Sequence, residues 1–223
     1  MGVKLFLIRH GQTLWNLEGR YQGDRDIELT ELGIRQAELA AGYLQNVDYS
    51  NIYCSPLKRT VATAEIINAK KKREIIVRQD LKEINFGKWE GLTFQQINQD
   101  YFEDYQAWLD DPFSNAPTGG EDFSHFVART SEEINRILAE NKDGSDVIIC
   151  THGGVIVALL VWWLRVPKDR WRSLIQRQGA INVVVVHKGF PYISQINYTG
   201  HLNGAYRHDE DKVIEVYSKL KDD

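Results

Sequence analysis

Short apolar runs alternate with helical patterns along this chain, and no other feature constrains its fold as strongly. The runs that resemble buried strands are Lys4–Arg9, Asn51–Cys54, Glu74–Arg78, Val147–Thr151 and Ala180–His187, with Tyr192–Tyr198 as a sixth candidate. Strands separated by helices are typical of parallel sheets whose two faces are covered by those helices. The sequence therefore predicts an α/β fold, a three-layer α/β/α sandwich with a largely parallel central sheet.

The spacing of apolar residues locates two of the helices. The first should begin at Thr30 as N-cap and carry its apolar face on Ile34, Ala37, Ala41 and Leu44. The second carries Phe123, Phe126, Val127, Thr130, Ile134, Ile137 and Leu138 on one face. Ser55-Pro56 predicts the start of a third helix, with serine as N-cap and proline in the first helical position.

Composition and length indicate one domain with an ordinary globular core. The chain has 223 residues, of which 43% are hydrophobic and 26% charged, enough to bury a single core. No repeat or linker divides it, so we expect one domain over residues 1–223. The formal net charge of -4 argues against nucleic acid or a membrane surface as partner, because both require broad positive patches.

The cysteines and the apolar runs bear on the compartment. Cys54 and Cys150 both lie in strand-like apolar runs, which indicates buried free thiols and a reducing compartment. The apolar patch Leu5–Ile8 is too short for a signal peptide. The longest apolar run, Val155–Leu164, falls well below the ~20 residues that a transmembrane helix needs. We therefore expect a cytoplasmic protein.

Charged and titratable side chains follow the predicted strands. Arg9 and His10 end the first strand, Arg59 follows the second, Glu83 follows the third, and His152 ends the fourth. In open α/β sheets, ligands bind beyond the carboxyl ends of the strands. Each residue by itself has an ordinary structural explanation, but together they predict one site at this edge of the sheet.

The predicted site is suited to a compact anion. Lys58 and Arg59 lie near the start of a helix, where the helix dipole disfavours cations by roughly 0.3–1 kcal/mol, and a bound anion would reverse that cost. In the segment His152-Gly153-Gly154, two glycines begin another helix, whose free N–H groups can bind an anion. Phosphate fits best, since arginines hold it through forked hydrogen bonds.

His10 can act as a nucleophile in such a site. Positive neighbours disfavour its protonated form, and a neutral imidazole can attack phosphorus. Metal binding is the competing use of two histidines. It has less support, because the neighbouring residues are arginines and the sequence has no His-x-x-x-His pair or cysteine cluster. No metal site is therefore predicted.

Four segments in this order resemble the histidine phosphatase superfamily, in its phosphoglycerate-mutase-like branch. They read "LIRHGQTLWN", "YCSPLKRTVATA", "LKEINFGKWEGLT" and "CTHGG", and the resemblance runs from Leu5 to about His187. "GGEDFSHFVART" (Gly119–Thr130) is also similar, although Asp122 stands where serine is more usual. The residues around Glu83 and His152 resemble those of the phosphatase subgroup more closely. That subgroup includes broad-specificity and α-ribazole phosphatases.

The resemblance implies a fold, an activity and a role for each site residue. It implies a phosphoglycerate-mutase-like fold and a phosphoric monoester hydrolase that needs neither metal nor cofactor. By position, His10 corresponds to the histidine that becomes phosphorylated and Glu83 to the proton donor for the leaving group. Residues corresponding to the phosphate pocket are Arg9, Arg59 and His152, with Asn16, Gln22, Gly23 and Gly153 lining it.

Several alternatives stay open at this point. A cofactor-dependent phosphoglycerate mutase, or a catalytically idle member that binds phosphorylated ligands, would share these motifs. We expect an aromatic-rich excursion at about 84–120 over the active site, in which packing is favoured over direct substrate contact. The partner is expected to be a small phosphorylated substrate, and the oligomeric state stays open, a homodimer being one alternative.

Overall fold

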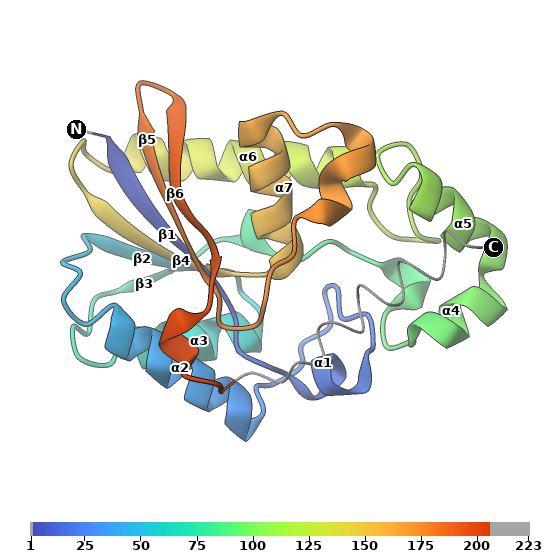
Figure 1. Ribbon diagram of the computed structural model, residues 1–223, viewed down its shortest axis with the longest axis horizontal. Coiled ribbons are helices and arrows are strands. Elements are labelled where there is room, and N and C mark those ends of the chain that lie inside the picture. The colour runs from blue at the N-terminus through green and yellow to red at the C-terminus, as the bar shows by residue number, and fades with distance from the viewer. Residues whose placement is uncertain (1, 206–223) are drawn as a thin grey trace.

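A six-stranded sheet in the order β3-β2-β4-β1-β5-β6 forms the centre of the computed structural model, which describes residues 2–205 (Figure 1). Its strands are β1 (Val3–Arg9), β2 (Asn51–Cys54), β3 (Ile75–Val77), β4 (Asp146–Thr151), β5 (Ile181–His187) and β6 (Phe190–Tyr198). The first four in spatial order run parallel, whereas β5 is antiparallel to both β1 and β6. All six predicted strands are confirmed, including the sixth candidate.

Helices cover both faces of the sheet, which confirms the three-layer sandwich (Figure 1). The α-helices are α1 (Leu14–Glu18), α2 (Glu31–Tyr43), α3 (Lys58–Asn68), α4 (Phe94–Asp100), α5 (Phe102–Asp110), α6 (Phe123–Glu140) and α7 (Gly153–Leu164). Short 3-10 helices are η1 (Gln79–Leu81), η2 (Gly87–Trp89), η3 (Lys168–Ser173) and η4 (Gly200–Leu202).

Alternate residues of β1 separate the two apolar cores. Leu5 and Leu7 pack in the core that contains α6 and α7 residues, whereas Phe6 and Ile8 pack in the core that contains α2 and α3 residues. This alternation follows from the period of two along a strand. A strand buried on both faces can carry polar residues only at its ends, so Arg9 and His10 fall at the carboxyl edge.

The structure confirms the start of α2 but corrects its buried face. Thr30 is the N-cap, and its hydroxyl accepts a hydrogen bond from the Gly33 N–H at 3.1 Å. Ala37 is buried as predicted, but Ile34 is 43% exposed. The backbone of Gly33 packs against Gly11, where an added Cβ would lie 2.2 Å from the Gly33 carbonyl oxygen. This close approach turns Gly33 inward and Ile34 outward.

The predicted start of α3 is wrong by two residues. The helix begins at Lys58 with Leu57 as N-cap, so Ser55 is not the cap. The carboxylate of Asp26 accepts a hydrogen bond from the Lys58 N–H at 2.7 Å, and the Lys58 ammonium pairs with Glu28 at 3.1 Å. The anion that compensates the cations at this helix start is therefore, in part, a carboxylate of the protein itself. The Ser55 hydroxyl has a different partner, described below.

The long helix α6 follows its predicted pattern closely. Its buried face includes Phe123, Phe126, Thr130, Ile134 and Ile137, and Asp122 is its N-cap, accepting a hydrogen bond from the His125 N–H at 2.9 Å. Aspartate is as good an N-cap as serine. The departure from the more usual serine at position 122 is therefore structurally neutral.

The excursion between Glu83 and α6 has a small core of its own, here called the aromatic cluster. Its buried members are Trp89, Ile97, Tyr105, Trp108 and Leu109. Trp89 meets Tyr105 and Trp108 edge to face, with ring centroids 5.3 and 5.8 Å apart, as aromatic pairs prefer. The packing interpretation thus holds for these rings, whereas Phe102 is 55% exposed.

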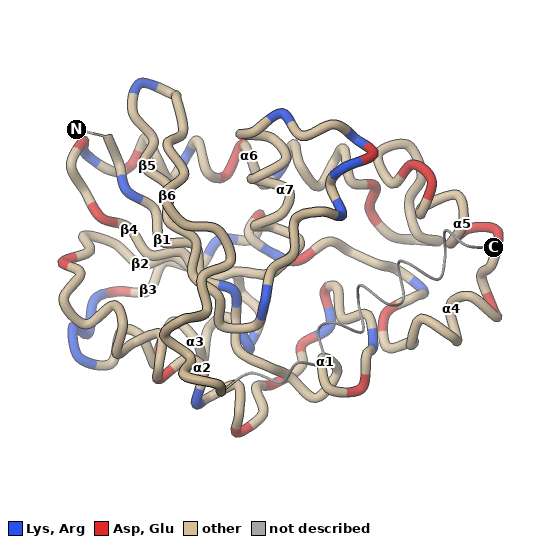
Figure 2. Tube along the Cα trace, in the orientation of Figure 1, with Lys and Arg blue, Asp and Glu red and all other residues tan. Residues whose placement is uncertain are grey.

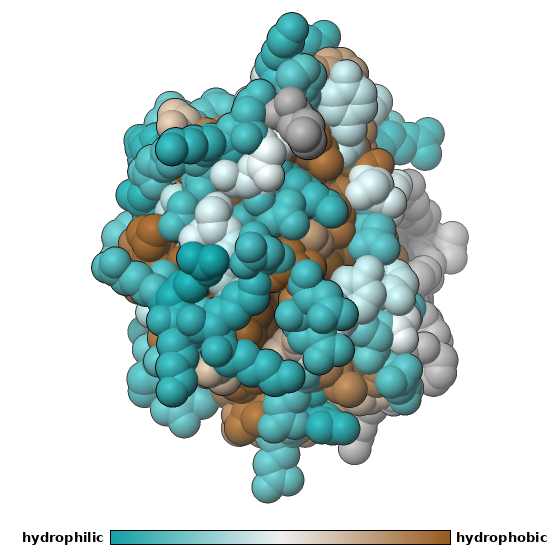
Figure 3. Space-filling model, turned by 90° about the vertical axis from the view of Figure 1, so that its left-hand side faces the viewer, coloured by the Kyte–Doolittle hydropathy of each residue, from teal (hydrophilic) through white to brown (hydrophobic). Residues whose placement is uncertain are grey.

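The surface and the thiols match an ordinary globular protein. Acidic and basic residues are interspersed over the molecule (Figure 2), and the face where β1 begins is mainly hydrophilic (Figure 3). Over residues 2–205, none of the helices combines the length and apolar character needed to cross a bilayer. Cys54 and Cys150 are buried free thiols, and burial raises the pKa of Cys54 to about 12.

Candidate active site

The carboxyl edge of the sheet brings together side chains from four distant segments. His10, Arg59 and His152 are buried, and the two imidazole rings lie 5.2 Å apart in an edge-to-face arrangement. Glu83 reaches the start of α7, directly after His152. The expectation that the strand ends meet at one site is thus confirmed as a matter of geometry.

His10 is held rigidly at the end of β1. Its backbone N–H donates to the Thr151 carbonyl at 3.0 Å, and its own carbonyl accepts from the Gly179 N–H at 3.1 Å. The ring nitrogen Nδ1 lies 2.7 Å from the Gly11 carbonyl oxygen. A carbonyl can only accept, so Nδ1 carries the proton and the neutral ring presents an unprotonated Nε2.

The surroundings favour the neutral form of His10. Burial, and then the positive charges of Arg59 and Arg9, hold the pKa of His10 well below its ordinary value of 6.5. At neutral pH the ring is therefore uncharged, with its Nε2 lone pair available. This is the protonation state that nucleophilic attack requires.

Arg59 is the most completely engaged cation of the site. Its Nη1 donates to the Arg25 carbonyl at 2.6 Å and its Nη2 to the Gly23 carbonyl at 2.8 Å. Burial lowers the pKa of Arg59 to about 10, so the guanidinium stays charged at neutral pH. Gly23 was predicted to line the phosphate site, and its carbonyl holds Arg59. With φ at 50°, and a Cβ that would meet Glu90 at 2.1 Å, this position requires glycine.

His152 uses both ring nitrogens within the site. Its Nδ1 accepts from Arg59 Nε at 3.3 Å, so its Nε2 carries the proton and donates to the Ser55 hydroxyl at 2.8 Å. Burial, together with Arg59 and His10, lowers the pKa of His152. Sequence reasoning missed Ser55, because the Ser-Pro pair resembled a helix start.

Glu83 is fixed at the first turn of α7. One carboxylate oxygen accepts from the Gly154 N–H at 3.0 Å and the other from the Ile84 N–H at 3.0 Å. A side chain at position 154 would collide with the carboxylate, since its Cβ would lie 2.2 Å from Glu83 Oε1. The second glycine of the "THGG" segment thus makes room for a carboxylate of the protein.

Arg9 lies over the first glycine of the same segment. Its Nη1 donates to the Gln176 carbonyl, and a Cβ at Gly153 would lie 3.2 Å from Arg9 Nε. Gln176 is in turn held by Asn182, whose amide donates to its side-chain oxygen at 2.9 Å. Neither residue carried a sequence signal, because the contact joins the segment before β5 to a residue within that strand.

Asn16, on α1, and Gln22, in the loop after that helix, both contact Thr13. The Asn16 side-chain oxygen accepts from the Thr13 N–H at 3.0 Å, and that of Gln22 accepts from the Thr13 hydroxyl at 2.8 Å. Their amide nitrogens are then the ends that can donate to an anion. Thr13, fully buried, was not singled out in the sequence.

The combined electrostatics suit a doubly charged anion. With both histidines neutral, the pocket presents the two guanidinium charges of Arg9 and Arg59, next to the carboxylate of Glu83. Arg59 is fully buried, and a buried charge is stabilised by an opposite one; a dianion of the size of phosphate would match the two guanidinium charges. Within the part of the chain that the structure describes, no group of three or more histidine, cysteine or acidic side chains is arranged to hold a metal ion.

Comparison with known proteins agrees with this arrangement. The sequence model of the histidine phosphatase superfamily (branch 1) matches residues 5–199. The chain belongs to this superfamily. The match includes all the site residues discussed above, from Arg9 to Gly153, and the resemblance inferred from the motifs is therefore confirmed.

Other members of the superfamily are similar over most of their length. Phosphoserine phosphatase 1 of Hydrogenobacter thermophilus is 31% identical over 204 residues, covering 92% of this chain and 96% of that protein. The adenosylcobalamin/α-ribazole phosphatase of Escherichia coli is 29% identical, covering 87% and 96%. Among solved structures, YhfR of Bacillus stearothermophilus superimposes with a TM-score of 0.85 at 31% identity, covering 90% and 99%.

Proposed function

We propose that this protein is a metal-independent phosphomonoesterase that transfers a phosphoryl group from small phosphorylated metabolites to His10 and then to water. The observation that carries this proposal is the tautomer of His10, whose Nδ1 proton is engaged by the Gly11 carbonyl at 2.7 Å. Nε2 is therefore the nucleophilic atom. Membership of the histidine phosphatase superfamily supports the same role.

The phosphate would be held by the charges around His10. Arg9 and Arg59 supply positive charge, and His152 is a further pocket residue. Asn16, Gln22 and the N–H of Gly153 would donate from the rim. Preorganised donors of this kind stabilise the charge that the phosphoryl oxygens carry in the transition state.

Glu83 would act as general acid and then as general base. In the first step Glu83 is protonated: the His10 Nε2–phosphorus bond forms, the ester phosphorus–oxygen bond breaks, and the Glu83 carboxylic acid gives its proton to the departing oxygen. In the second step water attacks phosphorus, the phosphorus–nitrogen bond breaks, and Glu83 takes a proton from the water.

Small phosphate esters of alcohols are the proposed substrates. The similar proteins are named for phosphoserine and for α-ribazole, and a broad-specificity or α-ribazole-phosphatase-like activity fits both.

The segment at about 84–120 would lie over the active site. Its Phe86 meets Tyr21, the residue before Gln22, with ring centroids 4.9 Å apart. The whole chain would act as one domain, of which residues 206–223 lie outside the described part. The buried free thiols fit a cytoplasmic location.

Trapping the phosphoenzyme tests this proposal. Rapid quench with a radiolabelled phosphate ester should yield an acid-labile, base-stable phosphoenzyme in the native protein and none in His10→Ala. A panel of phosphomonoesters that includes 3-phosphoglycerate separates the alternatives. Formation of 2-phosphoglycerate instead of glycerate and phosphate would indicate a mutase, and binding without turnover would indicate an idle member of the fold.

A further inference from the structure

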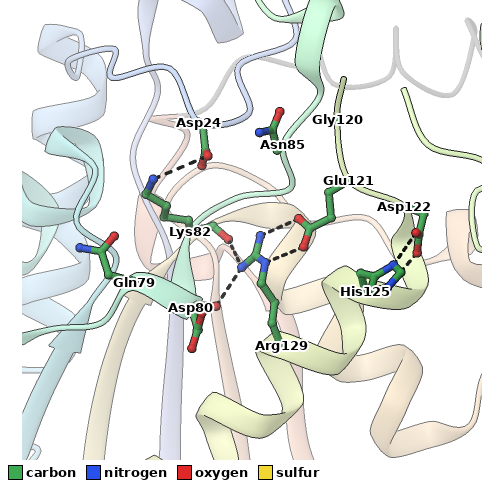
Figure 4. A pocket seen from close by; sticks show the side chains of 10 residues that line it. All are labelled: Asp24, Gln79, Asp80, Lys82, Asn85, Gly120, Glu121, Asp122, His125 and Arg129. Carbon is green, nitrogen blue, oxygen red and sulfur yellow. Dashed lines mark hydrogen bonds and ion pairs between the residues drawn. The ribbon is translucent and has the colours of Figure 1, made fainter. Parts of the chain in front are cut away.

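Arg129, on α6, lies between Glu121 and the segment that begins at Asp80, and it has an unusual set of partners there (Figure 4). Its guanidinium donates to the backbone carbonyls of Asp80, Lys82 and Glu83 at 2.9, 3.0 and 3.0 Å. It also makes a two-pronged ion pair with Glu121, at 2.8 and 2.9 Å. All three guanidinium nitrogens are therefore used, and three of the five hydrogen bonds go to the segment that carries Glu83.

Arg129 is also held by contacts with Phe126 and Glu121, which lie outside that segment. Its guanidinium carbon lies 4.7 Å from the centroid of the Phe126 ring, which is fully buried in the main core. Its partner Glu121 is tied to the same segment, since the Glu121 N–H donates to the Asn85 carbonyl at 2.8 Å. The planar fork of arginine is suited to such multiple contacts, which a lysine cannot reproduce.

Glu83 is consequently held at two points by two different helices. Its carboxylate is bound by the Gly154 N–H of α7, and its carbonyl is bound by Arg129 of α6. The segment between η1 and η2 is irregular, so these side-chain contacts take the place of a regular backbone ladder. Because α6 and α7 pack in the same layer, the carboxylate position depends on both.

We propose that Arg129 is the positioning residue for Glu83, acting through the backbone of residues 80–83 and not through contact with substrate. This inference rests on the proposed function, because it needs Glu83 to protonate the leaving group. A general acid must lie within hydrogen-bond reach of the oxygen that it protonates, and misplacement by about 1 Å can cost ~10²-fold in rate. Loss of the Arg129 guanidinium should therefore lower the rate of phosphorylation in the same way as loss of the Glu83 carboxyl, but by a smaller factor.

The test is a double-mutant cycle on the phosphorylation burst, with two substrates that differ in leaving group. An alkyl phosphate needs a proton on its departing oxygen, whereas p-nitrophenolate leaves without one. Arg129→Ala should slow phosphorylation by the alkyl ester by ~10²-fold and by p-nitrophenyl phosphate by only a few-fold. Added to Glu83→Gln, it should cause no further loss on the alkyl ester, since the acid it positions is already absent.

Two further variants separate positioning from stability. Arg129→Lys retains a positive charge near Phe126 but reaches fewer carbonyls, so its loss should be intermediate; it also serves if the alanine variant does not fold. Arg136→Ala is the matched control, because Arg136 lies on the same helix and pairs with the Asp80 side chain at 2.8 Å. It should leave both burst rates unchanged.

Defined outcomes would overturn the inference. Losses that multiply in the Glu83→Gln/Arg129→Ala protein, or equal losses on both substrates, would assign Arg129 to general structure. Those results leave the proposed function intact as long as Glu83→Gln alone discriminates between the two substrates. If Glu83→Gln alone shows no discrimination, or His10→Ala stays active, the proposed function itself fails.

Discussion

The candidate active site and the aromatic cluster bury similarly large side chains but treat their polar atoms differently. In the pocket, Arg59 and His152 are fully buried and each has hydrogen-bond partners. In the aromatic cluster, the indole nitrogens of Trp89 and Trp108 are buried without a partner among the described residues. An unsatisfied donor costs about 1–3 kcal/mol, which the large apolar area of each indole offsets.

This difference shows where each region obtains its order. The pocket is ordered by directional hydrogen bonds at strand ends. The aromatic cluster is ordered mainly by apolar and ring contacts, to which the Tyr105 hydroxyl adds one hydrogen bond with Tyr21 at 3.0 Å. Substitutions in the pocket should therefore reduce rate more than stability, and substitutions in the cluster should do the reverse.

The largest effect is expected for His10→Ala. Removing the proposed nucleophile should reduce turnover by more than ~10⁴-fold, by analogy with other enzymes that lose a covalent nucleophile, while the melting temperature changes little. His187→Ala is the control, since His187 ends β5 at the opposite edge of the sheet, next to the start of β1. Steady-state hydrolysis and thermal melts decide the outcome, and an active His10→Ala protein would contradict the mechanism.

The next effect is that of Glu83→Gln, which preserves size and polarity but cannot release a proton. Phosphorylation by an alkyl phosphate should fall by about 10²–10⁴-fold, whereas much of the rate with p-nitrophenyl phosphate should remain. Because water attack also loses its base, phosphoenzyme should accumulate with the activated ester. Stopped-flow bursts on both substrates measure this, and equal losses would place Glu83 in binding or structure.

A smaller loss is expected for Arg59→Ala, which removes one preorganised charge and should lower turnover by about 10²-fold or more. Lys58→Ala provides the neighbouring control, since that side chain is exposed and pairs with Glu28. EDTA should have no effect on either protein. Activity that is lost with the chelator and restored by a divalent ion would overturn the metal-independent mechanism.

Trp108→Ala tests whether the aromatic cluster contributes to stability and not to rate. Loss of a buried indole typically costs about 3–5 kcal/mol of stability, so the urea midpoint should fall clearly. The phosphorylation burst with p-nitrophenyl phosphate should stay within a few-fold of the native rate at temperatures where the variant is folded. Phe102→Ala, at an exposed position of the same helix, should change neither. A large loss of burst rate in folded Trp108→Ala would mean that the cluster contributes to the chemistry.

The smallest expected effect is the pH dependence of stability. The folded state keeps the pKa values of His10 and His152 well below 6.5, so the unfolded chain takes up protons first as the pH falls. Stability from this source is therefore full above pH 6.5 and declines below it. Urea unfolding at about pH 7.5 and 5.5 should show this decline, and His10→Asn should reduce it. An unchanged decline in His10→Asn would exclude His10 as a source.

Much of the fold and most of the site were predictable because their signals are local. The apolar runs marked the strands within two residues of their observed ends. The rule that strand ends share one edge then placed His10, Arg59 and Glu83 together. The errors arose where a distant contact overrode a local rule. Ser55 was predicted to be an N-cap, but its hydroxyl is hydrogen-bonded to His152 instead. Ile34 was predicted to be a core residue, but the packing of Gly33 on Gly11 leaves it exposed.

The sequence by itself determined which residues end the strands, and with them the charged and titratable side chains of the site, because strand periodicity and chain order are one-dimensional properties. Only the tertiary structure decided which nitrogen of His10 carries the proton, that Gly23 holds Arg59, and that Arg129 supports Glu83. The physical reason is that a hydrogen bond requires two groups within about 3 Å in the right orientation. Between residues far apart in the chain, that proximity exists only once the sheet and its helices have packed.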